Sequence, residues 1–313
     1  MSHDRHGLLL VDKPAGPTSH DVVQAARRAL KERRIGHTGT LDPAATGLLM
    51  LCVGKATRLQ QFLLAWPKSY AGEIRLGFPT STYDAEGAPT RDPVPVPALS
   101  GETLQALCAA FSGEIDQLPP PYSAKKVAGK KAYELARAGL EVPLEAKRVT
   151  LHELRLELAG PERIRFDVTC SSGTYVRSLA HDIGERLECG GHLATLRRMR
   201  IGPWRVEQAV AAEQLATRPH ELPPDALVPL SETALPFPEV TLNPAALDHF
   251  AHGQEVVVRE VEGEFVAGKH VTVRDRAGEL AGIGQTLVFM PRARTLHLAP
   301  KMVLAELEAP ART

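Results

Sequence analysis

The stretch Gly36–Gly47, which reads GHTGTLDPAATG, decides how the rest of the chain is interpreted. It places three glycines, three threonines and one proline around a single carboxylate, Asp42. Neither a helical nor a strand period fits these residues, so the pattern predicts a loop. Pro43 disfavours the helical conformation at Asp42. The apolar run Leu48–Val53 that follows is typical of a buried strand, which predicts that the loop holds its carboxylate beside a rigid element.

Composition alone leaves two interpretations of Asp42: a turn residue that bonds the local backbone, or a reactive carboxylate that the loop displays. The motif around Asp42 helps to decide between them. Gly-His-Thr-Gly-x-Leu-Asp-Pro-x-Ala-x-Gly closely resembles the catalytic motif of the TruB-type pseudouridine synthases. Enzymes of that family isomerise uridine to pseudouridine at position 55 in the T loop of tRNA. The resemblance implies that Asp42 is the catalytic nucleophile.

Four further segments resemble motifs of the same family and occur in the expected order. They are Asp12-Lys13-Pro14, Lys68-Ser69-Tyr70, Pro119–Lys126 and Cys170–Arg177, and His192–Arg198 resembles the last motif of the catalytic domain. The resemblance implies that Arg177 pairs with Asp42 and that Tyr70 stacks on the target uracil. Tyr175 and Leu196 would line the uridine pocket, and His37 would contact the flipped nucleotide. The residues expected to contact RNA are Lys13, Lys125, Lys126, Lys130, Arg197 and Arg198.

Two of these assignments have plainer alternatives in the residues themselves. A tyrosine in a strand, such as Tyr70, is more often a core aromatic, and His37 could be an ordinary turn histidine. Arg177 falls in the first turn of a helix expected over 174–187, where a cation opposes the helix dipole. That misfit indicates a partner carboxylate, and arginine is suited to the task because it stays charged and can grip two oxygens.

The length suggests two domains, although one large domain is also possible, and the family resemblance implies an α+β protein. With 313 residues and 43% hydrophobic side chains, the chain can bury a sizeable core. The family resemblance implies a pseudouridine-synthase fold with a mixed, largely antiparallel central sheet flanked by helices. Prolines recur from Glu213 to Pro238, where we expect a linker. The division is therefore a catalytic domain over 1–236 and a small β-barrel resembling a PUA-type RNA-binding domain over 237–313.

The distribution of charge is more informative than its neutral total of 37 basic and 37 acidic residues. Residues 211–264 hold two basic and ten acidic side chains, so the remainder carries an excess of eight positive charges. Between Lys125 and Arg148 there are seven basic and three acidic residues, with two tyrosines in or beside the run. A basic run is often only a solvated face, but this composition is also the one expected of an RNA-binding surface.

Several classes of protein are disfavoured. Four widely spaced cysteines without a Cys-x-x-Cys pair argue against a zinc or redox site and favour the cytoplasm. No apolar run approaches the length of a membrane span. The isomerisation needs no metal and no cofactor, so we expect none. Gly54-Lys55-Ala56-Thr57 superficially suggests a phosphate loop, but the full pattern is missing.

The partner expected is the T-arm stem-loop of tRNA, with no membrane and no obligatory protein partner. Two alternatives remain open: a non-enzymatic tRNA-folding chaperone that uses the same grip on the T loop, and an RNA-guided relative that works with partner proteins. The segment Thr80–Gly87 resembles a family loop, but Ser81 stands where an acidic residue is common. We therefore expect no catalytic role for that loop.

Overall fold

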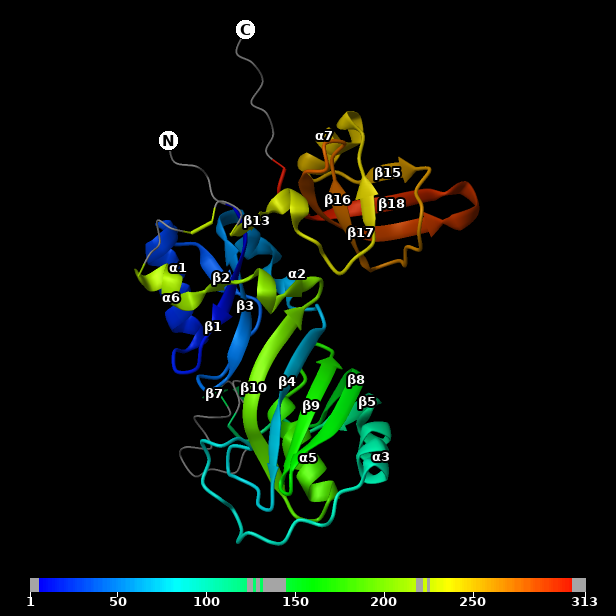
Figure 1. Ribbon diagram of the computed structural model, residues 1–313. Coiled ribbons are helices and arrows are strands. Elements are labelled where there is room, and N and C mark those ends of the chain that lie inside the picture. Colours follow the sequence, from blue (N-terminus) through cyan, green and yellow to red (C-terminus); the bar gives the residue numbers. More distant parts are fainter. Residues whose placement is uncertain are drawn as a thin grey trace.

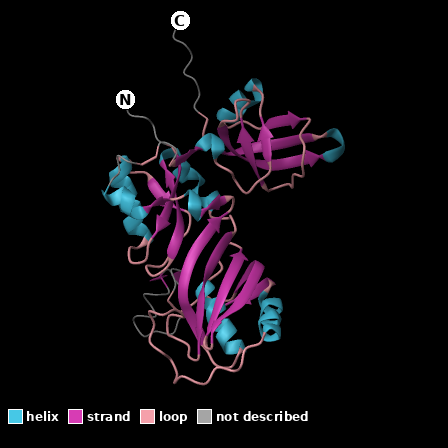
Figure 2. Cartoon of the chain, viewed as in Figure 1, coloured by secondary structure: helices cyan, strands magenta, loops and turns pink. Residues whose placement is uncertain are grey.

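Two β-sheets dominate the computed structural model, which describes residues 6–122, 126–127, 130–131, 145–217, 222–223 and 226–305. The larger sheet runs through the N-terminal two thirds of the chain, and the smaller one forms a separate C-terminal lobe (Figure 1). Helices lie against the larger sheet, as the cartoon coloured by secondary structure shows (Figure 2). The expected α+β architecture, with a mixed sheet flanked by helices, is confirmed.

The larger sheet has eleven strands, and most neighbours are antiparallel. Its main path is β12 (Val210–Ala211), β1 (Gly7–Lys13), β3 (Thr46–Val53), β10 (Gly191–Ile201), β4 (Lys68–Leu76), β9 (Arg163–Cys170), β8 (Lys147–Gly160) and β5 (Gly113–Gln117). Three short strands join its sides: β2 (Ile35–His37) pairs with β3, β11 (Trp204–Arg205) with β10, and β13 (Leu227–Pro229) with β1. β6 (Lys126–Val127) and β7 (Lys130–Lys131) pair with each other.

A short parallel seam joins the two halves of this sheet. β3 and β10 meet through two residue pairs, Arg197 with Thr46 and Arg198 with Gly47. Gly47 has a φ of +101°, and a Cβ added there would lie 2.3 Å from the carbonyl oxygen of Arg198. Only glycine therefore allows the strands to approach at this point. The loop that carries Asp42 ends at this seam.

Helices cover each half through apolar faces. α1 (Ser19–Leu30) begins with a capping box, in which Thr18 and Asp21 each bond the other's backbone. Its Val22, Val23 and Ala26 join a buried cluster with residues of β1 and β3. α5 (Val176–Arg186) packs through Leu179 and Ile183 on β4 and β9, and α3 (Gly101–Phe111) contacts β8.

The segment before β4 contains a 3₁₀ turn, η1 (Gly54–Leu59), followed by α2 (Gln60–Leu63). The linker expected from Glu213 to Pro238 is too long. Its first part contains α6 (Ala212–Thr217), which contacts α1, and β13, which adds an edge to β1. Proline is tolerated at such an edge, so its recurrence did not mark a free linker. The other turns are η2 (Val206–Gln208), η4 (Leu230–Glu232) and η5 (Pro291–Ala293).

The C-terminal lobe is a half-barrel of five strands. Their order is β14 (Glu239–Thr241), β16 (His270–Arg274), β17 (Leu280–Met290), β18 (Thr295–Val303) and β15 (Val256–Arg259). α7 (Pro244–Ala251) is capped by the Asn243 side chain and buries Phe250 against this sheet. On the other side, Leu280, Ile283 and Leu304 pack into a core shared with β1 and β3. The lobe is thus attached to the larger sheet by apolar contact as well as by the chain.

None of the helices within the described ranges is sufficiently long and apolar to cross a membrane.

Candidate active site

Two buried cationic side chains, Lys13 and Arg198, hold the loop that carries Asp42. Lys13, at the end of β1, is completely buried and its ammonium group donates to the carbonyls of Pro14, Pro43 and Ala45 at 2.8, 3.1 and 2.7 Å. Burial lowers the pKa of Lys13, and the negative charge of Asp42 opposes that shift. The prediction that Lys13 contacts RNA is wrong for this structure, because its ammonium group is buried and donates to loop carbonyls.

Arg198 holds the same loop from the seam. Its side chain is buried, with Nε donating to the Leu48 carbonyl at 2.7 Å and Nη2 to the Gly39 carbonyl at 3.1 Å. The prediction that Arg198 faces RNA is therefore also wrong. Successive side chains of a strand point to opposite faces, so Arg197 and Arg198 were never able to face RNA together. Arg197 points the other way and grips Asp12 with two bonds of 3.0 and 2.7 Å, while its side chain stays 39% exposed.

Arg177 reaches the loop from the start of α5. Its Nε lies 3.2 Å from Oδ2 of Asp42, so the two groups that the motif resemblance pairs do form an ion pair. Nη1 lies 3.3 Å from Oδ2 of Asp84 and donates to the Thr82 carbonyl at 3.1 Å. Nη2 donates to the Tyr122 carbonyl at 3.0 Å. The cost of a cation in the first turn of a helix is thus offset by two carboxylates.

The two carboxylates differ in how they meet solvent. The side chain of Asp42 is 45% exposed, whereas those of Asp84 and Arg177 are 16% and 11% exposed. Asp84 also accepts from the Thr82 hydroxyl and, at 3.1 Å, from the Glu86 amide. The arginine is therefore held on its inner side by a fixed carboxylate, and it presents Asp42 outward. This arrangement can keep one carboxylate oriented toward a bound group.

A small cavity opens beside Asp42. Its volume is about 40 Å³, and Arg177, Asp84 and Leu196 also line it, together with Ala44, Ala45, Ala85, Glu86, Leu193, Ala194 and Thr195. The cavity is small, and it lies beside the partly exposed carboxylate of Asp42. Two of its walls are the segment 84–86 and the bulged segment of β10 around Ala194.

The other residues predicted for the pocket lie around this cavity rather than in its lining. Tyr70 sits opposite Arg198 across β4 and β10 and packs partly buried between two cores, and burial raises its pKa. His37 ends β2, where its Nδ1 accepts from the Gly39 amide at 3.3 Å and burial lowers its pKa. Tyr175 caps α5, and its backbone exchanges two hydrogen bonds with the Gln117 side chain. Their contacts with a nucleotide remain predictions.

Three of the expected RNA contacts fall on the segment after Tyr122. Lys125 lies outside the described residues, and for Lys126 and Lys130 only the backbone of β6 and β7 is described. Their role also remains a prediction.

Sequence reasoning missed the loop Thr80–Gly87. The expectation that this loop has no catalytic role stays a prediction, but its Asp84 shares Arg177 with Asp42 and its Ala85 and Glu86 line the cavity. The signal was present: the motif resemblance matched Asp84 itself. The substitution at Ser81 drew attention away from it, although Ser81 only bonds the loop backbone through its amide.

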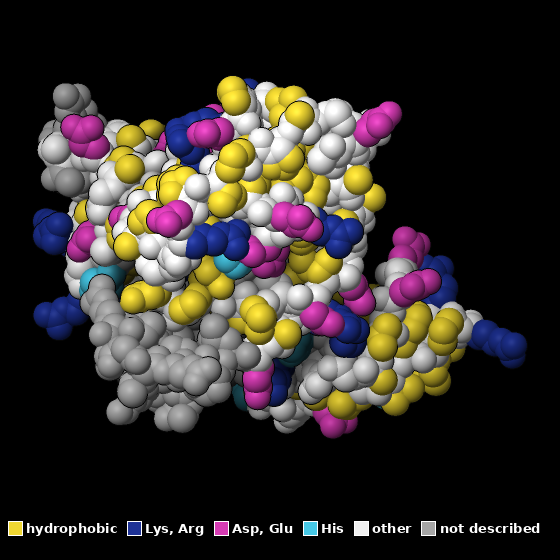
Figure 3. Space-filling model, turned by 90° about the horizontal axis from the view of Figure 1, so that it is seen from below, with side chains coloured by type: hydrophobic (Ala, Val, Ile, Leu, Met, Phe, Trp, Pro, Cys, Tyr) yellow, Lys and Arg dark blue, Asp and Glu magenta, His cyan; other side chains and the backbone are white. Residues whose placement is uncertain are grey.

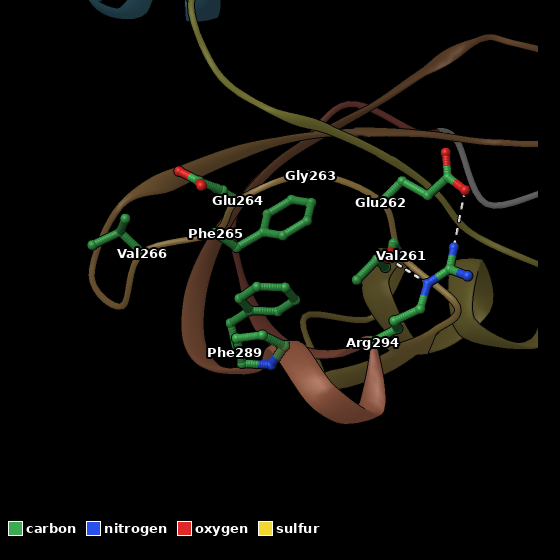
Figure 4. A pocket seen from close by; sticks show the side chains of 9 residues that line it. Val261, Glu262, Gly263, Glu264, Phe265, Val266, Phe289 and Arg294 are labelled. Carbon is green, nitrogen blue, oxygen red and sulfur yellow. Dashed lines mark hydrogen bonds and ion pairs between the residues drawn. The ribbon is translucent and has the colours of Figure 1, made fainter.

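Larger hollows lie elsewhere and have less suitable linings. One of about 570 Å³ in the C-terminal lobe is bordered by Phe265 and Phe289, with Glu262 and Glu264 at its rim (Figure 4). Arg294 in that lining is already paired with Glu262 at 3.0 Å. Acidic groups at the rim disfavour a phosphate, so this hollow does not resemble an RNA site.

Basic and acidic side chains alternate on the face of the molecule seen from below (Figure 3). The described part of this face therefore lacks a continuous basic surface. Across the described residues, no group of three or more His, Cys, Asp or Glu side chains is arranged to hold a metal ion.

Comparison with known proteins identifies the family. A model described as the N-terminal domain of the TruB family pseudouridylate synthases matches residues 27–176, and one described as the tRNA pseudouridylate synthase B C-terminal domain matches residues 177–233. A tRNA pseudouridine synthase B from Solibacter usitatus is 42% identical over 90% of this chain and 96% of its own length. The chain belongs to the TruB family of pseudouridine synthases. It is therefore an enzyme of the class that isomerises uridine to pseudouridine.

Other relatives and solved structures agree with that assignment. A TruB protein of the same name from Xanthomonas campestris pv. campestris is 44% identical over 89% of both chains, and one from Aromatoleum aromaticum is 48% identical over 76% of both. Among solved structures, the chain resembles the archaeal box H/ACA sRNP Nop10–Cbf5 complex with a TM-score of 0.73, 25% identity and coverage of 97% and 87%. A Cbf5–Nop10–Gar1 complex gives a TM-score of 0.75 at 25% identity, with coverage of 97% and 85%.

Proposed function

We propose that this chain is a tRNA pseudouridine synthase that converts uridine 55 of the T loop, with Asp42 as the essential nucleophile. The observation that carries the proposal is the Asp42–Arg177 ion pair of 3.2 Å at the edge of a cavity that Leu196 also lines. Relatives that cover most of the chain are tRNA pseudouridine synthases by name. The position in the T loop and the role of the aspartate rest on the motif resemblance.

The reaction requires one carboxylate and a correctly positioned nucleobase. The reaction breaks the C–N glycosidic bond and makes a C–C bond between the same base and sugar, so no atom is added and no oxidant is needed. An ordinary aspartate is ionised at neutral pH and needs no base to activate it. Arg177 orients Asp42 and stabilises its charge in the partly closed pocket. Arg177 is in turn held by Asp84 and the Thr82 carbonyl.

The target base has to leave its stack before it reaches Asp42. Flipping a base costs a few kcal/mol, which stacking and pocket contacts repay. Tyr70 is the aromatic that the proposal assigns to stacking, and stacking on one ring contributes about 1–3 kcal/mol per base. His37 would contact the flipped nucleotide, and Leu196 would pack against the uracil. The RNA contacts proposed are Lys125, Lys126, Lys130 and Arg197, with affinity set mainly by phosphate contacts.

The proposal includes a division of the chain at 236/237 into a catalytic domain and a PUA-like RNA-binding domain. The last strand of the larger sheet, β13, ends at Pro229, and the first strand of the smaller sheet, β14, begins at Glu239, which is consistent with that boundary.

The test compares Asp42→Asn with the wild type on unmodified tRNA. We expect the variant to bind tRNA with unchanged affinity and to form no pseudouridine, because the amide keeps the shape but loses the charge. Asp116→Asn is the matched control, since Asp116 pairs with Arg148 on the exposed edge strand. A second substrate, with cytidine in place of uridine 55, should give no product. Full activity of Asp42→Asn would contradict the role of the aspartate.

The same variant separates the remaining alternatives. If a tRNA-folding activity is the main role, Asp42→Asn should rescue a strain that lacks the protein as well as the wild type does. The similar solved structures are parts of multi-protein H/ACA particles, so an RNA-guided mode is the other alternative. Pseudouridine formation by the isolated chain on bare tRNA contradicts that mode.

A further inference from the structure

One face of α5 meets the loop Thr80–Gly87 and the chain just after it through three residues spaced one helical turn apart. Arg177 lies 3.3 Å from Asp84, and Glu185 lies 2.8 Å from Arg91. Between them, His181 stacks on Tyr83 with ring centroids 3.8 Å apart and an angle of 4° between the planes. Residues four apart lie on one side of a helix, so the three contacts form a ladder along α5. Its first rung is the pair that holds the catalytic arginine.

The middle rung differs from the Arg91–Glu185 pair in its burial. Both partners of the Arg91–Glu185 pair are 42% exposed, and such a pair contributes little. Tyr83 and His181 are each partly buried. Nδ1 of His181 is buried and finds no hydrogen-bond partner among the described residues. Burial also lowers the pKa of His181, which keeps the ring neutral at pH 7. The contact is therefore between two largely apolar ring faces, and it depends on their alignment.

The backbone of Tyr83 adopts a strained conformation. Its φ is +63°, a left-handed conformation that a bulky side chain rarely adopts. The conformation aims two groups at once. The Tyr83 carbonyl accepts from the Leu193 amide at 3.0 Å, and the next residue is Asp84. Leu193 and Asp84 both line the cavity beside Asp42. A shift of Tyr83 would therefore move one wall of the cavity and one partner of Arg177.

We propose that Tyr83 and His181 are positioning residues, whose ring stack sets the loop Thr80–Gly87 against α5 so that Asp84 keeps Arg177 directed at Asp42. The inference rests on the proposed function, because it presumes that Arg177 acts on the reaction through Asp42. The Tyr83–His181 stack lies outside the reacting groups, and it sets the fraction of molecules in which Asp84 and Arg177 are correctly placed.

The experiment uses variants that separate the ring from the backbone. Tyr83→Gly removes the ring and also relieves the left-handed φ, whereas Tyr83→Phe keeps the ring. His181→Ala removes the partner, and His181→Phe restores a flat ring. We measure kcat, KM and the tRNA dissociation constant on unmodified tRNA, with rates normalised to the folded fraction by circular dichroism.

The stack predicts a specific pattern. Tyr83→Gly and His181→Ala should each lower kcat by roughly 2- to 10-fold, the range expected for an aromatic pair, with tRNA affinity unchanged. Tyr83→Phe and His181→Phe should stay within about twofold of the wild type. The double variant Tyr83→Gly with His181→Ala should be no slower than the slower single variant, because both remove one contact. A purely structural role would lower the melting temperature without changing the normalised kcat.

Three results would overturn the inference: an unchanged kcat in both ring-deletion variants, additive losses in the double variant, or an equal loss in Tyr83→Phe. Asp42→Asn run in the same assay separates this failure from failure of the proposed function. If Asp42→Asn is inactive while Tyr83→Gly is fully active, only the positioning role is lost. If Asp42→Asn is active, the proposed function fails, and the positioning role fails with it.

Discussion

Arg177 and Arg274 are two buried arginines that make the same kinds of contact for different ends. Each side chain is 11% exposed, and each binds a carboxylate that is about half exposed, Asp42 in one case and Glu239 in the other. Each also donates to backbone carbonyls. Arg274 donates to Ser231, Gly278 and Thr233 at 2.6, 3.0 and 3.0 Å. A buried arginine with a carboxylate is therefore not by itself the mark of an active site.

The difference lies in what surrounds the carboxylate. Asp42 borders a cavity, and its arginine is shared with a second acid, Asp84, on the loop Thr80–Gly87. Arg274 instead ties the end of β16 to the chain that leaves the larger sheet, between the two lobes. On the proposed function, Arg177 orients the reactive carboxylate, whereas Arg274 joins the two lobes. Changes at the two sites should affect different measurements.

The largest effect is expected at Arg177. Arg177→Lys keeps one positive charge but cannot serve Asp42, Asp84 and two carbonyls at once, since an ammonium lacks the planar fork. We expect kcat to fall about 100-fold, equivalent to about 2.7 kcal/mol, at unchanged tRNA affinity. Arg163→Lys is the control, because Arg163 pairs with Glu73 at 3.0 Å away from the cavity and should leave kcat unaltered.

Arg274→Lys should reverse that pattern. Loss of charge-assisted bonds to buried carbonyls should lower the free energy of unfolding by about 2 kcal/mol, as measured by chemical denaturation. At a temperature where the variant is folded, kcat should match the wild type. A variant that loses activity while it keeps its stability would show that the two arginines are not separated in function.

A third change tests a buried acid on the same helix as Arg177. Burial, with a smaller contribution from Glu185, raises the pKa of Asp182 to about 6 from an ordinary 3.8. The folded state therefore holds a proton that the unfolded state has released between those values. Stability from this group is present below about pH 4 and is lost as pH rises through 6. Asp182→Asn should remove this fall and stabilise the protein at pH 7.5 by about 1–2 kcal/mol. An unchanged pH profile of unfolding would count against it.

The smallest effect is expected for Glu239→Gln, the same chemical change at Arg274 that Asp42→Asn makes at Arg177. Because Glu239 is 50% exposed, its pair should contribute less than about 1 kcal/mol to stability. Activity should be unaffected. Comparable loss of activity in Glu239→Gln and Asp42→Asn would remove the distinction between the two sites.

Much of the fold could be predicted from local patterns. The buried strand after Gly47 and the helix over 174–187 were each predictable, because apolar periods are local properties. The seam between β3 and β10 was not, since it joins residues about 150 positions apart through only two pairs. Nor was the place of β13, which lies in the proline-containing segment expected as a linker.

The sequence predicted site residues that belong to a motif. It was less informative about side-chain directions that depend on the fold. The Asp42–Arg177 pair followed from two motifs. Lys13 and Arg198 were misjudged, because a basic residue in a sequence looks the same whether it faces solvent or a loop carbonyl. The strand alternation that separates Arg197 from Arg198 was available in principle. The stack of Tyr83 on His181 was not, because no local pattern links positions 83 and 181.

The narrow parallel join at Thr46 and Gly47 has a consequence for how such a protein can change over time. Each half of the large sheet has its own apolar interior, so loops and outer strands on either flank can lengthen, shorten or be exchanged without disturbing the other. The carboxylate stands at the place where both flanks meet. The flanks can therefore be altered with little effect on the central backbone contacts, which Gly47 allows to be close because it has no side chain.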